Sequence, residues 1–214
     1  PRLIPGAVRR NHEQAADWGE EFSGRPAIVV CLRGQKLAQG TAAWLRHLDV
    51  AAEALEGGFE GWKAAKLPLV PAEKLPARDA KGRTVWVTRA RPKIDRIACP
   101  WLVARFIDAA PEFVYVPGSD VMKVAAETGA IPYDVPNVEL GHHGDRCSFD
   151  AFIARYELRD AALDKLALVV RAADCGQPQL AKEAAGLLAI SKGLSLNFEN
   201  DHEMLRRGMV IYDA

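Results

Sequence analysis

The chain has 214 residues, of which 49% are hydrophobic and 26% charged, enough apolar material for one large or two small folded domains. Lysine and arginine (28) balance aspartate and glutamate (28), so the zero net charge excludes a chain-wide attraction to nucleic acid or to an anionic membrane. Four cysteines are too few for a disulfide scaffold, and without a secretory signal or a long apolar run we expect a cytoplasmic protein.

The first part of the chain alternates short apolar runs with an amphipathic segment. Residues 27–30 are continuously apolar, as in a strand buried on both faces. Residues 37–48 carry apolar side chains at helical spacing, and residues 50–55 form a second short strand before two glycines. Strand, helix and strand joined by glycine turns predict a parallel α/β sheet.

Cys31 follows the first predicted strand, where a short turn leads into the helix. Backbone N–H groups in such a turn, together with the positive end of the helix dipole, lower the pKa of a thiol and favour its nucleophilic thiolate. Gly34 supplies the backbone freedom that the turn requires, and Arg33 and Lys36 add positive charge. A buried structural cysteine at the end of a strand is the alternative that these residues leave open.

Two motifs extend this interpretation: Cys-x-x-Gly-x-Lys at residues 31–36 and Glu-Gly-Gly-Phe-Glu-Gly-Trp at residues 56–62. Together they resemble the rhodanese (sulfurtransferase) family over residues 1–70. The resemblance implies that Cys31 takes a sulfane sulfur as a persulfide and passes it to a thiol acceptor, with no cofactor. It also implies a loop that binds a small anionic sulfur donor, formed by Leu32, Arg33, Gly34, Gln35 and Lys36.

The sequence departs from the rhodanese pattern at two points. Lys36 stands where many members have arginine, so a compact ammonium charge replaces a guanidinium group that can donate two hydrogen bonds to one anion. The family's first strand has no counterpart near Pro1, so we expect a rhodanese-like parallel sheet that is cropped at that strand. Prolines and charges without an apolar period predict a linker at residues 71–83.

After the linker, the sequence predicts a mainly α-helical α+β domain over residues 84–214. The predicted strands are residues 84–87 and 113–116. The predicted helices are residues 97–107, with Asp95 as their N-cap, residues 160–173, and residues 179–191, which end at Lys192 and Gly193. A last helix is predicted to begin after a cap at Asn200 or Asp201.

Basic residues gather around the first of these strands and the proline turn that follows it. On such a turn their side chains would converge on an oxyanion. The residues of this predicted oxyanion site are Arg89, Arg91, Lys93 and Arg96. A solvated basic surface is the alternative.

Residues 139–150 concentrate imidazole, carboxylate and thiol groups. Glu139 and His142 have the Glu-x-x-His spacing of some metal–carboxylate sites. Imidazole and carboxylate suit Zn, Fe, Mn or Ni, and the thiol of Cys147 favours Zn or Fe. The predicted ligands of this divalent or transition metal, whose identity stays open, are Glu139, His142, His143 and His202. The alternative is structural, with Asp145 and Asp150 as turn caps and Glu203 paired with Arg207.

Four segments, at residues 86–102, 138–150, 184–191 and 201–205, are together very similar to the C-terminal domain of ChrB-type chromate resistance proteins. The second of them reads Val-Glu-Leu-Gly-His-His-Gly-Asp-Arg-Cys-Ser-Phe-Asp. The similarity implies a role in chromate resistance or sensing, with chromate as a candidate ligand. Some members carry a DNA-binding segment ahead of this domain, but no helix-turn-helix pattern is present here, so we expect no nucleic acid partner.

Two functions follow from these patterns. The main prediction is a rhodanese-type (thiosulfate) sulfurtransferase that works through a Cys31 persulfide and is linked to chromate resistance. The alternative is a non-catalytic sensor or binding protein for chromate or metal, with an inactive rhodanese module. A metal-dependent enzyme in the second domain is a third reading, which requires a stoichiometric metal.

Overall fold

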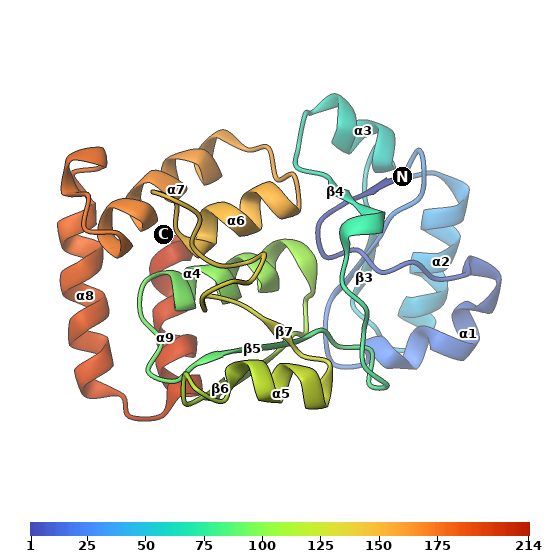
Figure 1. Ribbon diagram of the computed structural model, residues 1–214. Helices are drawn as coiled ribbons and strands as arrows, with labels where there is room; N and C mark the ends of the chain where they lie inside the picture. Colours follow the sequence, from blue (N-terminus) through green and yellow to red (C-terminus); the bar gives the residue numbers. More distant parts are fainter. The chain divides into compact units, whose positions relative to one another are not determined.

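The structure is a computed structural model that describes residues 1–214, and the chain divides into two compact units (Figure 1). The larger unit comprises Pro1–Gly6 and Val70–Ala214, and the smaller unit comprises Ala7–Leu69. Residues 1–6, predicted as part of the first domain, lie with the larger unit, because β1 (Arg2–Leu3) pairs antiparallel with β4 (Val70–Pro71). The predicted linker therefore starts in regular structure, and the 3₁₀ turn η3 (Ala72–Lys74) follows β4.

The smaller unit is a short parallel sheet with helices packed on it. β2 (Ala27–Val29) pairs in parallel with β3 (Ala52–Ala54), and α2 (Lys36–His47) connects them. Leu45 of α2 packs on Val50, as its helical spacing predicts. The other elements are η1 (His12–Gln14), α1 (Ala15–Trp18), η2 (Gly19–Phe22) and α3 (Gly58–Ala64). The parallel α/β arrangement is confirmed, whereas a rhodanese fold stays a prediction.

The larger unit is built on a three-stranded parallel sheet with the order β6–β5–β7. Its strands are β5 (Val85–Arg89), β6 (Glu112–Val116) and β7 (Ile131–Pro132). On one face Val87 packs on α5 (Val121–Thr128), and on the other face Trp86 packs into the main helical core. Because both faces are covered, β5 begins with a continuous apolar run at residues 85–87, without the alternation of a half-exposed strand.

Most of the helices lie on the face of the sheet opposite α5 (Figure 1), and Trp86 packs into the core that they form. They are α4 (Asp95–Leu102) continued by a π-helical turn η4 (Val103–Ile107), α6 (Ser148–Arg155), α7 (Ala161–Asp174), η5 (Pro178–Leu180), α8 (Ala184–Asn197) and α9 (Asp201–Asp213). The buried helix α4 contacts α6, α7 and α9, and its Trp101 and Leu102 pack with Phe149 of α6. None of these helices combines the length and apolarity needed to span a bilayer.

Side-chain caps explain where two of these helices begin. Asp160 Oδ1 accepts the amides of Ala162 and Leu163 at 2.8 and 3.1 Å, ahead of α7. Asn200 Oδ1 accepts the amide of Glu203 at 3.0 Å, which confirms the predicted cap of α9.

Three predicted helix boundaries are wrong. The helix predicted from residue 179 begins only at Ala184, because Pro178–Leu180 forms the separate turn η5 and Ala181 after it is extended. α8 continues past Gly193 to Asn197, because an internal glycine costs a helix only about 1 kcal/mol and Leu194 beyond it packs against the core. Asp95 is the first residue of α4 and not its N-cap, which is Ile94. The carboxylate of Asp95 is instead buried and bonded to groups outside its own helix.

Candidate functional site

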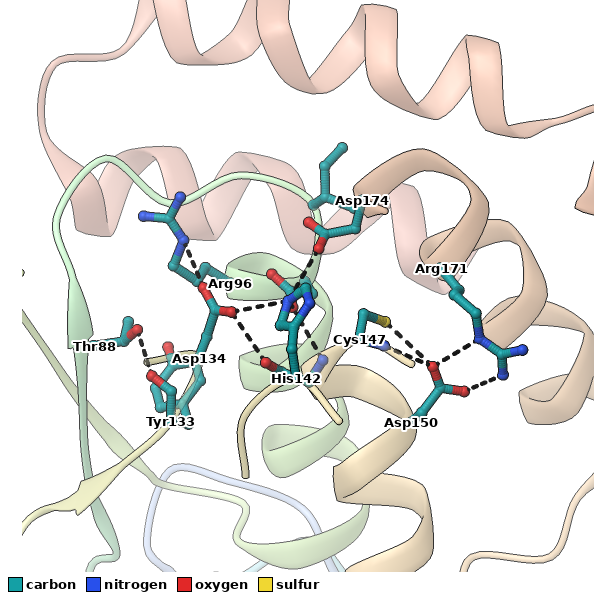
Figure 2. A network of polar contacts seen from close by, with 12 residues as sticks. Thr88, Arg96, Tyr133, Asp134, His142, Cys147, Asp150, Arg171 and Asp174 are labelled. Atoms are coloured by element: carbon teal, nitrogen blue, oxygen red, sulfur yellow. Dashed lines mark hydrogen bonds and ion pairs between the residues drawn. The ribbon is translucent and has the colours of Figure 1, made fainter. Parts of the chain in front are cut away.

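Three carboxylates surround the ring of His142 in the larger unit (Figure 2). Its Nε2 atom lies 3.2 Å from Asp95 Oδ2, 3.2 Å from Asp134 Oδ1 and 3.3 Å from Asp174 Oδ2. We call these four residues the His142 cluster. They come from the first residue of α4, the segment after β7, the loop before α6 and the last residue of α7.

The parallel sheet explains why two of these acids meet. β5 and β7 run in the same direction, so the segments after their carboxyl ends lie at one edge of the sheet. Asp134 follows β7, and Asp95 opens the helix after β5. Both segments contain non-glycine residues with positive φ, 50° at Asp134 and 45° at Ile94. Such backbone conformations are unfavourable and concentrate at functional sites.

The carboxylates of the cluster are buried and held by other polar groups. Asp95 and Asp134 are each 2% exposed. Asp134 pairs with Arg89 at 2.7 Å and with Arg96 at 3.1 Å, and it accepts a hydrogen bond from the Ser148 hydroxyl at 3.0 Å. The Ser148 amide also donates to Asp95 at 3.3 Å. The His142 side chain is 43% exposed, so the cluster is open to solvent on the imidazole side.

Crowding changes the protonation of the cluster. Burial and the nearby Asp95 charge raise the pKa of Asp134, and burial with the charges of Asp95 and Asp134 raises the pKa of Asp174 to about 7. The hydrogen bond to Asp95 outweighs burial and raises the pKa of His142 to about 9. At neutral pH the cluster therefore holds a proton on His142 and a partial proton on Asp174, which offset the carboxylate charge.

The donor types and spacing of the cluster suit a metal ion. Ligand atoms of His142, Asp95 and Asp134 lie within 4.8 Å of one another, as do those of His142, Asp174 and Cys175. Four ligands at about 2.0–2.1 Å from a tetrahedral Zn²⁺ are separated by about 3.3 Å. The distances from His142 Nε2 to the three carboxylate oxygens match this value, while Asp174 groups with Cys175 and not with Asp95 and Asp134. Hydrogen-bonded carboxylates such as these are typical of metal ligands. Once its protons leave, the cluster can bind a cation.

Of the four predicted metal ligands, only His142 lies in this cluster. The exposed Glu139 carboxylate pairs with Arg155 at 3.0 Å. The ring of His143 bonds the Glu139 carbonyl oxygen at 2.8 Å, and the ring of His202 lies edge-on to Tyr115 with centroids 5.5 Å apart. These three side chains are therefore engaged elsewhere.

Two neighbouring groups take the structural roles that the sequence left open. Cys147 is buried, and both its amide and its thiol contact Asp150, which caps the start of α6. Asp150 also pairs with Arg171 of α7 (Figure 2). Glu203 pairs with Arg207 at 2.8 Å, as expected for residues four apart on a helix.

The partners of His142 were missed because each is an isolated acid beside an apolar run. Asp95 was interpreted as a helix cap, and Asp134 and Asp174 have no neighbouring histidine along the sequence. A weak signal was present at Asp174, which ends an amphipathic helix next to a cysteine.

The basic residues of the predicted oxyanion site bond groups within the protein. Arg89 and Arg96 pair with Asp134. Arg91 donates to the carbonyl oxygens of Ser195, Phe198 and Glu199 at the end of α8, while Lys93 is exposed. The three guanidinium groups are thus neutralised or bonded internally.

In the smaller unit, the loop at residues 31–36 directs backbone amides at Cys31. Burial alone would raise the pKa of this thiol, but hydrogen bonds from the amides of Arg33, Ala38, Gln35 and Gly34 outweigh it, so the pKa of Cys31 is lowered. Leu32 and Lys36 are exposed, and Arg33 pairs with Glu60 at 3.3 Å. The loop thus has the ring of amides expected around Cys31.

Glycines allow this loop to pack against the segment at residues 56–62. The amides of Phe59 and Glu60 donate to the carbonyl oxygens of Cys31 and Leu32, each at 2.9 Å. Gly58 has a φ of +57°, and a Cβ atom there would lie 2.3 Å from the Cys31 carbonyl oxygen. The glycine pair thus permits a backbone-to-backbone contact that no larger residue allows.

Comparisons with known proteins bear on the larger unit. The family described as "ChrB, C-terminal domain" matches residues 86–214, which include the whole His142 cluster. Protein ChrB of Cupriavidus metallidurans is 33% identical over 147 residues, covering 67% of this chain and 44% of that protein. The chain thus spans less than half the length of this curated relative. No solved structure shows a significant match.

The family match begins after the Cys31 loop. None of these similarities supports a rhodanese domain or sulfurtransferase activity, which stay predictions. The resemblance of the second domain to chromate resistance proteins is confirmed, and because the match covers more than half of the chain, this protein belongs to the ChrB C-terminal domain family.

Proposed function

We propose that this chain is a non-catalytic metal-binding protein linked to chromate resistance, and that its His142 cluster takes up a divalent transition-metal ion. The observation that carries this proposal is the convergence of three carboxylates on one imidazole nitrogen at 3.2–3.3 Å. The role in chromate resistance rests on the family to which residues 86–214 belong.

The charge of the cluster favours a cation over chromate. A dianion would meet three carboxylates around His142, and the nearest guanidinium groups, those of Arg89 and Arg96, already pair with Asp134. A divalent cation instead replaces the protons that balance these carboxylates.

The ligand number favours binding over catalysis. His142 belongs to two groups of possible ligands, one with Asp95 and Asp134 and one with Asp174 and Cys175, so the protein offers enough side chains to complete a tetrahedral sphere, whereas catalytic zinc sites leave a position open for water or substrate. An ion here would join the loop before α6 to the ends of α4 and α7. Binding would thereby stabilise this part of the larger unit, which is a means of sensing the ion.

Calorimetric titration of the metal-stripped chain with Mn²⁺, Co²⁺ and Zn²⁺ tests the proposal. We expect binding of one ion per chain, lost in His142→Ala and retained in the matched variant His143→Ala, whose side chain bonds the Glu139 carbonyl oxygen outside the cluster. A chain that binds none of the three ions, or a His142→Ala variant that binds as tightly as the parent, would overturn it. Chromate binding by the metal-free chain, tested in parallel, would also count against a cation site.

A second candidate function is sulfur transfer through Cys31, favoured by the lowered pKa of this thiol within its ring of amides. In this reaction the Cys31 thiolate attacks the outer sulfur of thiosulfate, the S–S bond breaks, and sulfite leaves with the bonding electron pair. The persulfide then passes its outer sulfur to a thiol or to cyanide. We expect thiocyanate formation and a Cys31 persulfide detected by mass spectrometry, both lost in Cys31→Ser and kept in Cys175→Ser. If the parent chain forms neither thiocyanate nor a Cys31 persulfide, this function is excluded.

A further inference from the structure

Cys175 lies next to the His142 cluster, at the carboxyl end of α7 directly after Asp174. Its thiol sulfur, the Asp174 carboxylate and a ring nitrogen of His142 lie within 4.8 Å of one another. The two groups of possible ligands, His142 with Asp174 and Cys175 and His142 with Asp95 and Asp134, share the His142 ring, so Cys175 borders the His142 cluster.

The other cysteines are unsuited to this site. Cys99 is fully buried in the core of the larger unit, and the buried thiol of Cys147 is bonded to Asp150. Cys31 belongs to the smaller unit. Cys175 is a half-buried free thiol, and only its backbone amide is bonded, to the carbonyl oxygen of Arg171.

We infer that Cys175 is a sulfur ligand of the His142 cluster and makes the site selective for a thiophilic metal ion such as Zn²⁺ or Co²⁺. This inference rests on the proposed metal-binding function and names the class of ion that the site takes. The carboxylates by themselves suit Mg²⁺ and Mn²⁺ as well as Zn²⁺, whereas a thiolate strongly favours the softer ions.

The binding step is a ligand exchange without oxidation or reduction. The Cys175 thiol loses its proton to solvent, and the thiolate donates an electron pair to the metal ion. Asp174 and Cys175 are adjacent at the helix end, so both can approach one ion through small side-chain rotations. An ion placed there would have nitrogen, oxygen and sulfur ligands, a set that occurs with zinc and cobalt.

Absorption spectroscopy of the full chain loaded with Co²⁺ tests this inference separately from the proposed function. Co²⁺ in a tetrahedral protein site gives visible d–d bands much stronger than those of the aqueous ion, whereas a near-ultraviolet charge-transfer band appears only when a thiolate is bound. We expect both signals in the parent chain and in the control Cys31→Ser, and the d–d bands alone in Cys175→Ser. We also expect Cys175→Ser to lower Zn²⁺ affinity by about tenfold or more while Mn²⁺ affinity changes less than about twofold.

The possible spectra distinguish the role of Cys175 from the presence of the metal site itself. The d–d bands without a charge-transfer band in the parent chain would overturn the role of Cys175 and leave the metal site intact. A charge-transfer band that persists in Cys175→Ser would assign the sulfur ligand to another cysteine and overturn the inference. A spectrum with only the weak bands of aqueous Co²⁺ would overturn the proposed function and this inference together.

Discussion

Nε2 of His142 lies 3.2 Å from Oδ2 of Asp95, although 47 residues separate the two along the chain. The same carboxylate oxygen accepts the amide of Ser148 at 3.3 Å, so the starts of α4 and α6 and the His142 loop meet at one atom. This contact makes the cluster part of the core of the larger unit, and the loop that carries His142 is held where three acids surround it.

Metal affinity at the cluster is expected to rise with pH. An ion must displace the proton on His142, whose pKa is about 9, the partial proton on Asp174, whose pKa is about 7, and, with Cys175 as a ligand, the proton on that thiol, whose pKa is about 11. Since these pKa values are raised, protons compete with the metal ion for the ligand atoms throughout the neutral range, and they compete more strongly as the pH falls. We expect Zn²⁺ affinity to increase by about tenfold or more per pH unit between about pH 6 and 8.

Calorimetry in buffers of different ionisation enthalpy measures the protons released, and we expect at least one per ion. His143→Ala should keep the same slope as the parent chain. An affinity that is flat with pH, or that falls as the pH rises, would contradict this assignment of the protons.

Asp108 is expected to stabilise the larger unit in its ionised form. Its carboxylate, 2% exposed, accepts the amide and hydroxyl of Thr84 at 2.7 and 2.8 Å and the guanidinium of Arg78 at 2.7 Å. Burial alone would raise its pKa, but these bonds outweigh burial and lower it. A lowered pKa gives stability that is complete above the unfolded value of about 3.9 and is lost as the pH falls through the folded value.

We therefore expect Asp108→Asn to lower the free energy of unfolding at pH 7 by about 2 kcal/mol, and to lose less stability than the parent chain below about pH 4. Urea unfolding at both pH values measures this difference. Glu127→Gln is the control, because this exposed carboxylate pairs with Lys123 only at 3.9 Å and should contribute less than about 0.5 kcal/mol. Equal effects of the two substitutions would show that the Asp108 bonds do not stabilise the fold.

Gly58→Ala is expected to disrupt the Cys31 loop. The new Cβ atom would lie 2.3 Å from both the Cys31 carbonyl oxygen and the Gly34 amide nitrogen, and φ is +57°. We expect a loss of about 2–3 kcal/mol in the stability of the smaller unit. The Cβ atom added by Gly40→Ala in α2 would have no atom within 4 Å, so this substitution should stabilise the helix by up to about 1 kcal/mol. Thermal unfolding of the two variants gives the comparison, and similar melting temperatures would be inconsistent with the close packing of the loop.

Cys31 is expected to be alkylated at lower pH than Cys175 in the metal-free chain. Backbone amides lower the pKa of Cys31, whereas burial and the Asp174 charge raise the pKa of Cys175 to about 11. Mass spectrometry after short exposure to iodoacetamide across a pH series gives the midpoint for each thiol. Coincident midpoints would mean that the loop amides do not stabilise the Cys31 thiolate.

The sequence predicts the local features of this protein well. The periodicity of α2 and α7, the apolar runs of β2 and β5, and the turn after Cys31 all arise from residues close together along the chain. A helix or a loop of this kind is specified by short-range spacing and by glycine, so its pattern is visible before the fold is known. The boundaries near Asp95 and Gly193 were wrong because burial of neighbouring side chains outweighs the local preference for a cap or a stop.

Of the four predicted metal ligands, His142 alone lies in the His142 cluster, and a metal site there stays a prediction. Glu139 and His143 are close to His142 in sequence, but they bond Arg155 and a backbone oxygen instead of lining the cluster. Residues 137–146 run through successive turns, which direct neighbouring side chains to different sides, so sequence proximity does not make two side chains ligands of one ion.

By itself the sequence determined a parallel α/β segment around Cys31, a chromate-resistance type of second domain, and a histidine-rich loop suited to metal chemistry. Only the tertiary structure decided which acids meet that loop. Asp95, Asp134 and Asp174 are separated by up to 79 residues (174 − 95) and converge because β5 and β7 are parallel neighbours and α7 ends beside α4. Burying like charges together is unfavourable unless positive groups lie beside them, and here His142, Arg89 and Arg96 do so. These groups meet the acids only in the folded chain, so no short-range sequence pattern reveals the cluster.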